Sequence, residues 1–186
     1  MQFYFKVVKF VEDSYAKGDP YFAEDVSHLK DTAELVKKLK PDADEALLIS
    51  AVSHDIERAF RDEKQMELAK FGTEEYYKIH QEKGADIVVN FLKSLGADKK
   101  LTDKVWSLIS KHEVGGDEDQ TLLKDADSLS FFTKDGTINF FLTKRLQKVG
   151  KENIKKKFDW MFNRIISEKA KEIARPLYES ALKRLE

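Results

Sequence analysis

The chain has 186 residues, and its 33 lysines and arginines nearly balance 34 aspartates and glutamates, for a formal net charge of −1. This length suits one domain with a substantial core, and the lack of cysteine excludes disulfides and thiolate metal sites, in keeping with a cytoplasmic protein. Generic nucleic-acid binding would need a more basic chain, and we find no secretory signal and no apolar run long enough to span a bilayer.

Apolar residues recur at helical spacing along almost the whole chain, and no alternating strand pattern of useful length is present. In chain order, the predicted helices cover residues 1–17, about 23–39, a segment from 42 that includes 54, 73–95, about 102–113, 121–132, and one or two helices over 151–185. In the second of these, one apolar face is formed by Leu29, Ala33, Val36 and Leu39. The pattern predicts an all-α protein.

Several residues mark where the predicted helices begin and end. Pro41 ends the second helix, because proline disfavours helical geometry in the residue before it. Asp42, with Glu45 three residues later, resembles a capping box and predicts the start of the third helix. Gly96 ends the fourth, and Pro176 is a candidate kink or boundary within the C-terminal helices.

The chain contains only four histidines, each on a different predicted helix or close to its end. They are His28, His54, His80 and His112. Zinc, iron and manganese accept imidazole and carboxylate ligands, and a metal site in a helical bundle takes ligands from several facing helices. Asp55 adds a carboxylate beside His54 in the otherwise apolar stretch AVSHDIERAF. On these residues alone, four unrelated surface or core histidines remain the alternative.

The order of His28, the His54-Asp55 pair and Asp127 within ADSL (126–129) resembles the HD superfamily of metal-dependent phosphohydrolases. Members have a first histidine near a helix start, the His-Asp doublet, and a final aspartate in a similar stretch. The resemblance covers about residues 22–132. It implies a single-domain HD bundle over 1–186, in which this core carries the N-terminal helix 1–17 and C-terminal helices at about 136–185.

Two further segments resemble the members that bind two metals. HQEKGADIVVNFL (80–92) places a histidine before a Gly-Ala pair, and LISKHEVGG (108–116) is similar to a later histidine-containing segment. The resemblance implies one ion held by His28, His54, Asp55 and Asp127, and a second held by His80 and His112, with Asp55 as the bridge. The ions could be Fe, Mn, Mg, Co, Ni or Zn, and a site with one ion remains the alternative. We prefer Asp127 to Asp125 because only Asp127 precedes Ser-Leu.

The resemblance implies hydrolysis of a phosphate ester or anhydride by a metal-activated hydroxide, with a small nucleotide as the expected substrate. Asp55, Glu57 and Arg58 are the catalytic candidates, and Arg58 and Lys30 are the candidates for substrate binding. A salt bridge is the alternative role for Arg58, solvated surface positions are the alternatives for Glu57 and Lys30, and no Ser-His-Asp arrangement is evident.

Other functions remain open within the same family. Diadenosine tetraphosphate hydrolases share the ligand order, whereas phosphodiesterases for cyclic dinucleotides have paired histidines and a glycine-tyrosine-proline stretch that this chain lacks. The alternatives from other classes are an HD-type di-iron oxygenase and a non-catalytic nucleotide-sensing module. We expect a small phosphorylated partner, no membrane or nucleic acid, and a monomer or homodimer.

The C-terminal third carries no motif of this family. Its basic run KRLQKVGKENIKKKF (144–158) is typical of a solvated helix face, with contact to a phosphate-rich substrate or to nucleic acid as the alternative. Its aromatic residues are expected to pack the last helices onto the bundle; they are Phe131, Phe132, Phe140, Phe141, Trp160 and Phe162.

Overall fold

The structure is a computed structural model that describes residues 1–19, 25–61, 73–133 and 135–185. These residues form helices and no strand, so the predicted all-α, single-domain class is confirmed. The elements are α1 (Tyr4–Lys17), α2 (Asp25–Leu39), α3 (Glu45–Ser53), the 3₁₀ helix η2 (Ile56–Phe60), α5 (Glu74–Ser94), α6 (Lys99–Ile109), α7 (Glu118–Thr133), α8 (Asp135–Phe140), the π-helix η3 (Phe141–Arg145), α9 (Leu146–Val149), α10 (Lys151–Arg164) and α11 (Glu168–Leu185). No helix within these ranges is long and apolar enough to cross a membrane.

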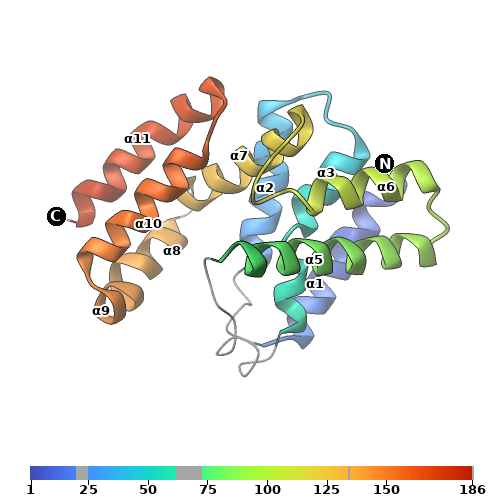
Figure 1. Ribbon diagram of the computed structural model, residues 1–186, viewed down its shortest axis with the longest axis horizontal. Helices are drawn as coiled ribbons and strands as arrows, with labels where there is room; N and C mark the ends of the chain where they lie inside the picture. Colours follow the sequence, from blue (N-terminus) through green and yellow to red (C-terminus); the bar gives the residue numbers. More distant parts are fainter. Residues whose placement is uncertain (20–24, 62–72, 134, 186) are drawn as a thin grey trace.

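Helix α7 joins the two ends of the molecule (Figure 1). It packs against α2 and α3 among the N-terminal helices, and against α10 and α11 in the C-terminal group. A large apolar cluster fills the space among α1, α2, α3, η2, α5, α6 and α7 and includes Ala170 and Ala174 of α11, and a smaller one lies between the end of α7 and helices α8, α10 and α11. The chain therefore has one main core with a second aromatic core attached to it through α7.

The predicted apolar face of the second helix is confirmed. Leu29, Ala33 and Val36 are fully buried in the main core, and Leu39 is nearly so. The predicted first residues of this helix, 23 and 24, lie outside the described residues. The start of α5 is also confirmed, because the Thr73 side chain accepts a hydrogen bond from the Tyr76 backbone N–H and caps the helix.

The capping box predicted at Asp42 is wrong. Helix α3 begins one residue after Asp44, whose Oδ1 accepts a hydrogen bond from the Leu47 N–H at 3.0 Å. Glu45 instead accepts hydrogen bonds from the backbone N–H groups of Phe3 (2.6 Å) and Tyr4 (2.9 Å). Glu45 therefore satisfies donors at the start of α1, a long-range role that the local spacing could not reveal.

The C-terminal helices divide at 165–167, and Pro176 lies inside α11. The division is held by Asp125 of α7, whose buried carboxylate accepts hydrogen bonds from the backbone N–H groups of Ile166 (2.9 Å) and Ser167 (2.7 Å). The aromatic prediction is confirmed for Phe131, which meets Phe158 edge-on in the smaller core. Trp160 differs: it is 38% exposed and lies outside both clusters.

Candidate metal centre

The structure brings all six predicted metal ligands together at the middle of the helical bundle. His28 lies in the first turn of α2, His80 on α5, and Asp127 on α7. The other three lie just after helix ends, at the positions His54, Asp55 and His112. Four histidines from four segments thus approach two aspartates, the same six residues that the resemblance in the sequence implied as ligands.

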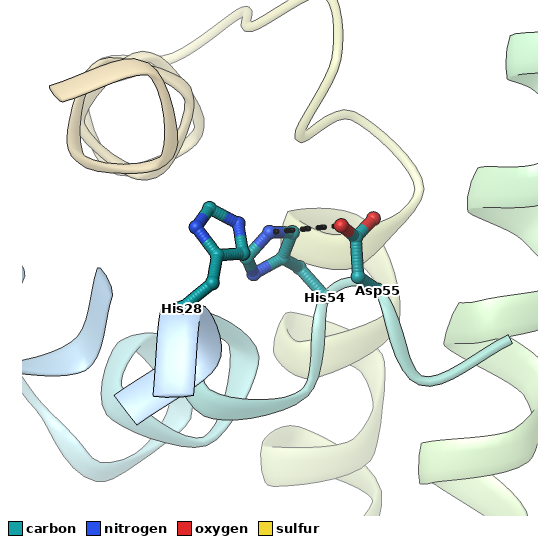
Figure 2. A group of neighbouring side chains, drawn as sticks. All are labelled: His28, His54 and Asp55. Atoms are coloured by element: carbon teal, nitrogen blue, oxygen red, sulfur yellow. Dashed lines mark ion pairs between the residues drawn. The ribbon is translucent and has the colours of Figure 1, made fainter. Parts of the chain in front are cut away.

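The His-Asp doublet reaches the centre because α3 ends at Ser53, directly before His54. His54 keeps helical dihedrals (φ −56°, ψ −34°), whereas Asp55 has φ −99° and ψ 12° and precedes η2. The two side chains then lie side by side, with the His28 ring next to them (Figure 2). A continuous helix would separate adjacent side chains by about 100°. The chain avoids this separation by leaving the helix.

Helix α5 approaches this turn closely because it carries a glycine. A Cβ added to Gly84 would lie 3.2 Å from the carbonyl oxygen of His54 and 3.8 Å from Cβ of Glu57. The contact is tighter than ordinary packing, so Gly84 lets the helix that carries His80 pack directly against the doublet.

Asp55 is the hub of one group of candidate ligands. Its Oδ1 lies 2.8 Å from Nε2 of His80 and 3.5 Å from Nε2 of His112. The ligand atoms of these three buried residues all lie within 4.8 Å of one another. This geometry could hold an ion between one carboxylate oxygen and two imidazole nitrogens.

The second group shares Asp55. The ligand atoms of His28, His54 and Asp55 also lie within 4.8 Å of one another. Asp127 joins this group, because its Oδ1 lies 3.1 Å from Nε2 of His28 and 3.6 Å from Nε2 of His54. The arrangement matches the expected division of six ligands into two sets with one shared carboxylate.

Each of the four imidazoles uses Nδ1 for a protein partner and presents Nε2 to the aspartates. The Nδ1 partners are Ser130 Oγ for His28 (2.6 Å), Ala51 O for His54 (2.9 Å), Glu57 Oε2 for His80 (2.8 Å) and Ile109 O for His112 (2.8 Å). Such partners fix the ring orientation and the tautomer that leaves Nε2 free to coordinate a metal.

Two of these Nε2 atoms test whether a metal fits. Nε2 of His54 and Nε2 of His112 are buried and lack a hydrogen-bond partner among the described residues. Their Nδ1 atoms face backbone carbonyls, which requires a proton on Nδ1 and makes Nε2 the ring atom that can bind either a proton or a metal ion. A buried Nε2 that faces a carboxylate is costly unless a proton or a metal ion lies between the two. The residues therefore fit a divalent ion.

The electrostatics favour positive charge at this point. Burial would lower the pKa of His54, but the negative charges of Asp55 and Asp127 raise it to about 9, so without a metal ion this imidazole holds a proton that a bound cation would replace. Burial would raise the pKa of Asp55, but Arg58 and His54 hold it well below its usual range, so its carboxylate is ionised. Burial lowers the pKa of His112, which is neutral at pH 7 and able to act as a ligand.

A family model described as "Domain of unknown function (DUF4202)" matches residues 11–181. The chain belongs to this family. No curated protein and no solved structure matches the chain. The DUF4202 match extends beyond the HD-like segment at 22–132 and takes in α8 to α10 and most of α11. The C-terminal helices are therefore part of the DUF4202 unit.

Two of the remaining predicted residues border the centre. Arg58 Nη1 lies 2.7 Å from Asp55 Oδ2 and 3.4 Å from Asp25 Oδ2, and 30% of its side chain is exposed. Glu57 is buried, and its Oε2 accepts a hydrogen bond from Nδ1 of His80 and pairs with Arg61 at 2.5 Å. Glu57 is thus a positioning residue for His80. Although burial would raise its pKa, the contacts with His80 and Arg61 lower it to about 2.

Lys30 does not reach this cluster. Its ammonium pairs with Glu12 of α1, and about half of its side chain is exposed. Asp125 also lies apart from the six ligands, because both of its carboxylate oxygens bind backbone amides at the start of α11. The choice of Asp127 over Asp125 therefore agrees with the geometry.

One buried group of charged residues at the centre was not predicted from the sequence. Arg164, at the end of α10, places Nη2 2.8 Å from Glu113 Oε2 and Nη1 3.3 Å from Asp127 Oδ2. All three side chains are about nine-tenths buried. Glu113 directly follows His112 and could have been suspected on that ground. Arg164 lies outside the HD-like segment, and no local pattern marks it.

Proposed function

We propose that this DUF4202 protein is a metal-dependent phosphohydrolase that cleaves a phosphate ester or anhydride, with a small nucleotide as the expected substrate. The observation that carries the proposal is the convergence of four imidazole Nε2 atoms on Asp55 and Asp127, two of them buried with no protein partner. Divalent ions held there would supply hydroxide near neutral pH and positive charge opposite the phosphoryl oxygens.

The residues around the ligands support this chemistry. Arg58 holds Asp55 from one side and keeps 30% of its side chain exposed, so its remaining N–H groups can donate to a phosphoryl oxygen. Glu57 holds the ring of His80, and Ser130 holds the ring of His28. Arg58 would contact the substrate, whereas Glu57 and Ser130 hold two ligand histidines in position.

A Ser-His-Asp chain is also present, although the sequence did not reveal it. Ser130 Oγ lies 2.6 Å from Nδ1 of His28, whose Nε2 lies 3.1 Å from Asp127. Ser130 is fully buried, and its hydroxyl also accepts a hydrogen bond from Thr32. A nucleophile must meet its substrate, so this buried hydroxyl argues against acyl transfer and for a role in orienting His28.

The proposal is tested by metal content and turnover together. Protein purified without added metal or chelator should contain metal by elemental analysis and hydrolyse bis(p-nitrophenyl) phosphate with Mn²⁺. Asp55→Ala should lose this turnover, and Lys30→Gln should keep it, because Lys30 lies outside the cluster. Turnover that requires oxygen would favour an oxygenase. Failure to bind metal after soaking in Mn²⁺ would reject the proposal.

A further inference from the structure

One face of α10 carries Arg164, which contacts the candidate ligand Asp127. Lys157, Trp160 and Arg164 follow one another at spacings of three and four residues and share this face. The Lys157 Nζ lies 4.2 Å from the centroid of the Trp160 ring, and the Arg164 Cζ lies 4.6 Å from it. Tyr77 of α5 stacks near-parallel on the same indole at 6.4 Å. The aromatic pair thus holds two cations of α10 in place.

These two cations differ in their partners. Arg164 is paired with Glu113 and Asp127, as Arg58 is paired with Asp55. Lys157 has no carboxylate at ion-pair distance among the described residues, and its ammonium contacts aromatic rings only. Burial, together with the nearby Arg164, lowers the pKa of Lys157 to about 8. A partly desolvated ammonium without an anion is unfavourable unless a ligand supplies one.

The charges around the centre indicate which kind of ligand would supply an anion to Lys157. Among the described residues, five carboxylates of the centre and its border face four cations, and two divalent ions would leave an excess of three positive charges. The carboxylates are Asp25, Asp55, Glu57, Glu113 and Asp127, and the cations are Arg58, Arg61, Lys157 and Arg164. A phosphodiester carries one negative charge and a phosphate monoester about 1.5 to 2 at pH 7, so neither balances this excess, whereas a ligand with two linked phosphates carries about three and would.

We propose that Lys157 and Arg164 form an anion subsite beside the metal centre that binds a second phosphate of the substrate, next to the one that is attacked. The substrate class is then a phosphoanhydride, such as a nucleoside diphosphate or a longer polyphosphate. This inference rests on the proposed function for the identity of its ligand. Its location is carried by the contacts of α10 alone.

A purely structural cation–π pair between Lys157 and Trp160 is the competing explanation, and the two differ in anion binding. The chain has two tryptophans, so Trp106→Phe leaves Trp160 as the only indole and as a reporter 4.2 Å from the ammonium. We would titrate this variant, with a fixed excess of Mn²⁺, against inorganic pyrophosphate and, separately, inorganic phosphate. The fluorescence of Trp160 should change on binding of pyrophosphate.

The decisive comparison is Lys157→Met against Lys156→Met in the same background. Methionine keeps much of the apolar stem and removes the charge, and Lys156 is an exposed neighbour that pairs with Glu152. Loss of one charge-assisted contact should weaken pyrophosphate binding by about tenfold or more, weaken phosphate binding much less, and leave the control unchanged. Lys157→Arg should restore most of the affinity.

Each result bears on one proposal separately. Unchanged pyrophosphate affinity in Lys157→Met, or no pyrophosphate binding by the parent protein, would overturn the subsite even if phosphodiester turnover is present. Specific weakening in Lys157→Met would support the subsite even if no hydrolysis is found, in which case only the proposed reaction would fail.

Discussion

Asp55 and His80 form the closest pair between two candidate metal ligands, with Oδ1 and Nε2 separated by 2.8 Å. His80 comes from the middle of a long helix, whereas Asp55 lies just after the end of another. Asp55 also belongs to the group that contains His28 and His54. One carboxylate therefore links two sets of histidines, and the number of bound ions becomes a measurable consequence.

His80→Ala and His112→Ala should each reduce bound metal toward one ion per chain. Each change removes one imidazole from the same group around Asp55 Oδ1 and leaves His28, His54 and Asp127 in place. Elemental analysis after soaking in Mn²⁺ and gel filtration measures this directly. The metal content of Lys30→Gln should match the parent protein. Parent-like stoichiometry in both histidine variants would remove the two-metal interpretation.

Glu57→Gln should weaken metal binding by about 10- to 100-fold, because the contact that orients His80 loses its charge. The glutamine can still accept from Nδ1, so the ring should remain in place while the basicity of Nε2 falls. Competition with a chromogenic chelator measures the affinity. Glu75→Gln, an exposed glutamate in the first turn of the same α5, is the matched control. Equal metal affinities in both variants would mean that Glu57 does not influence metal binding through His80.

The sequence was sufficient for the parts of the site that depend on residue type and order. Four histidines on different helices, with the His54-Asp55 doublet, indicated one cluster, and apolar periodicity indicated the helices that carry it. The convergence of His54 and Asp55 could not be derived, because it depends on α3 ending at Ser53. Helical periodicity does not show at which residue a helix ends, and helix boundaries are the least precise part of a prediction from sequence.

Contacts between distant segments could not be predicted from the sequence, for a different reason. Glu45 caps α1, and Arg164 reaches Asp127 from the end of α10. Both are charged residues whose local surroundings resemble ordinary solvated helix positions. Their partners are fixed by tertiary packing alone, so a pattern along the chain cannot distinguish them from surface residues.

Asp125 and Asp127 provide a matched pair that separates stability from metal binding. Asp125→Ala should lower the free energy of unfolding by about 2 to 4 kcal/mol, because two backbone N–H groups at 166 and 167 lose a buried acceptor. Its metal content should stay at the parent value. Asp127→Asn should do the opposite, with reduced metal and a smaller change in urea unfolding of the metal-free protein. Loss of metal in Asp125→Ala, with parent-like metal content in Asp127→Asn, would assign the ligand role to Asp125.

The final prediction concerns pH and follows from the subsite on α10. Lys157 has a pKa of about 8, set by burial and Arg164 on α10, with Glu113 after α6 and Asp127 on α7 acting to raise it and Arg58 of η2 to lower it. Pyrophosphate binding should favour the protonated ammonium, so the bound form has the higher pKa. The contribution of Lys157 is then complete below pH 8 and is lost as the pH rises through the pKa of the bound form.

A tenfold preference for the charged form corresponds to about one pKa unit, so the loss should fall between about pH 8 and pH 9. The measurement is the ratio of pyrophosphate affinities of the parent protein and Lys157→Met, both with Trp160 as the only indole. Use of the ratio cancels the titration of pyrophosphate and of the metal ligands, which both proteins share. We expect a ratio of about ten at pH 7 that approaches one above pH 9. A ratio that stays at ten across this range would mean that the pKa of the Lys157 ammonium lies above it. A ratio of one at pH 7 would show that Lys157 does not belong to the subsite.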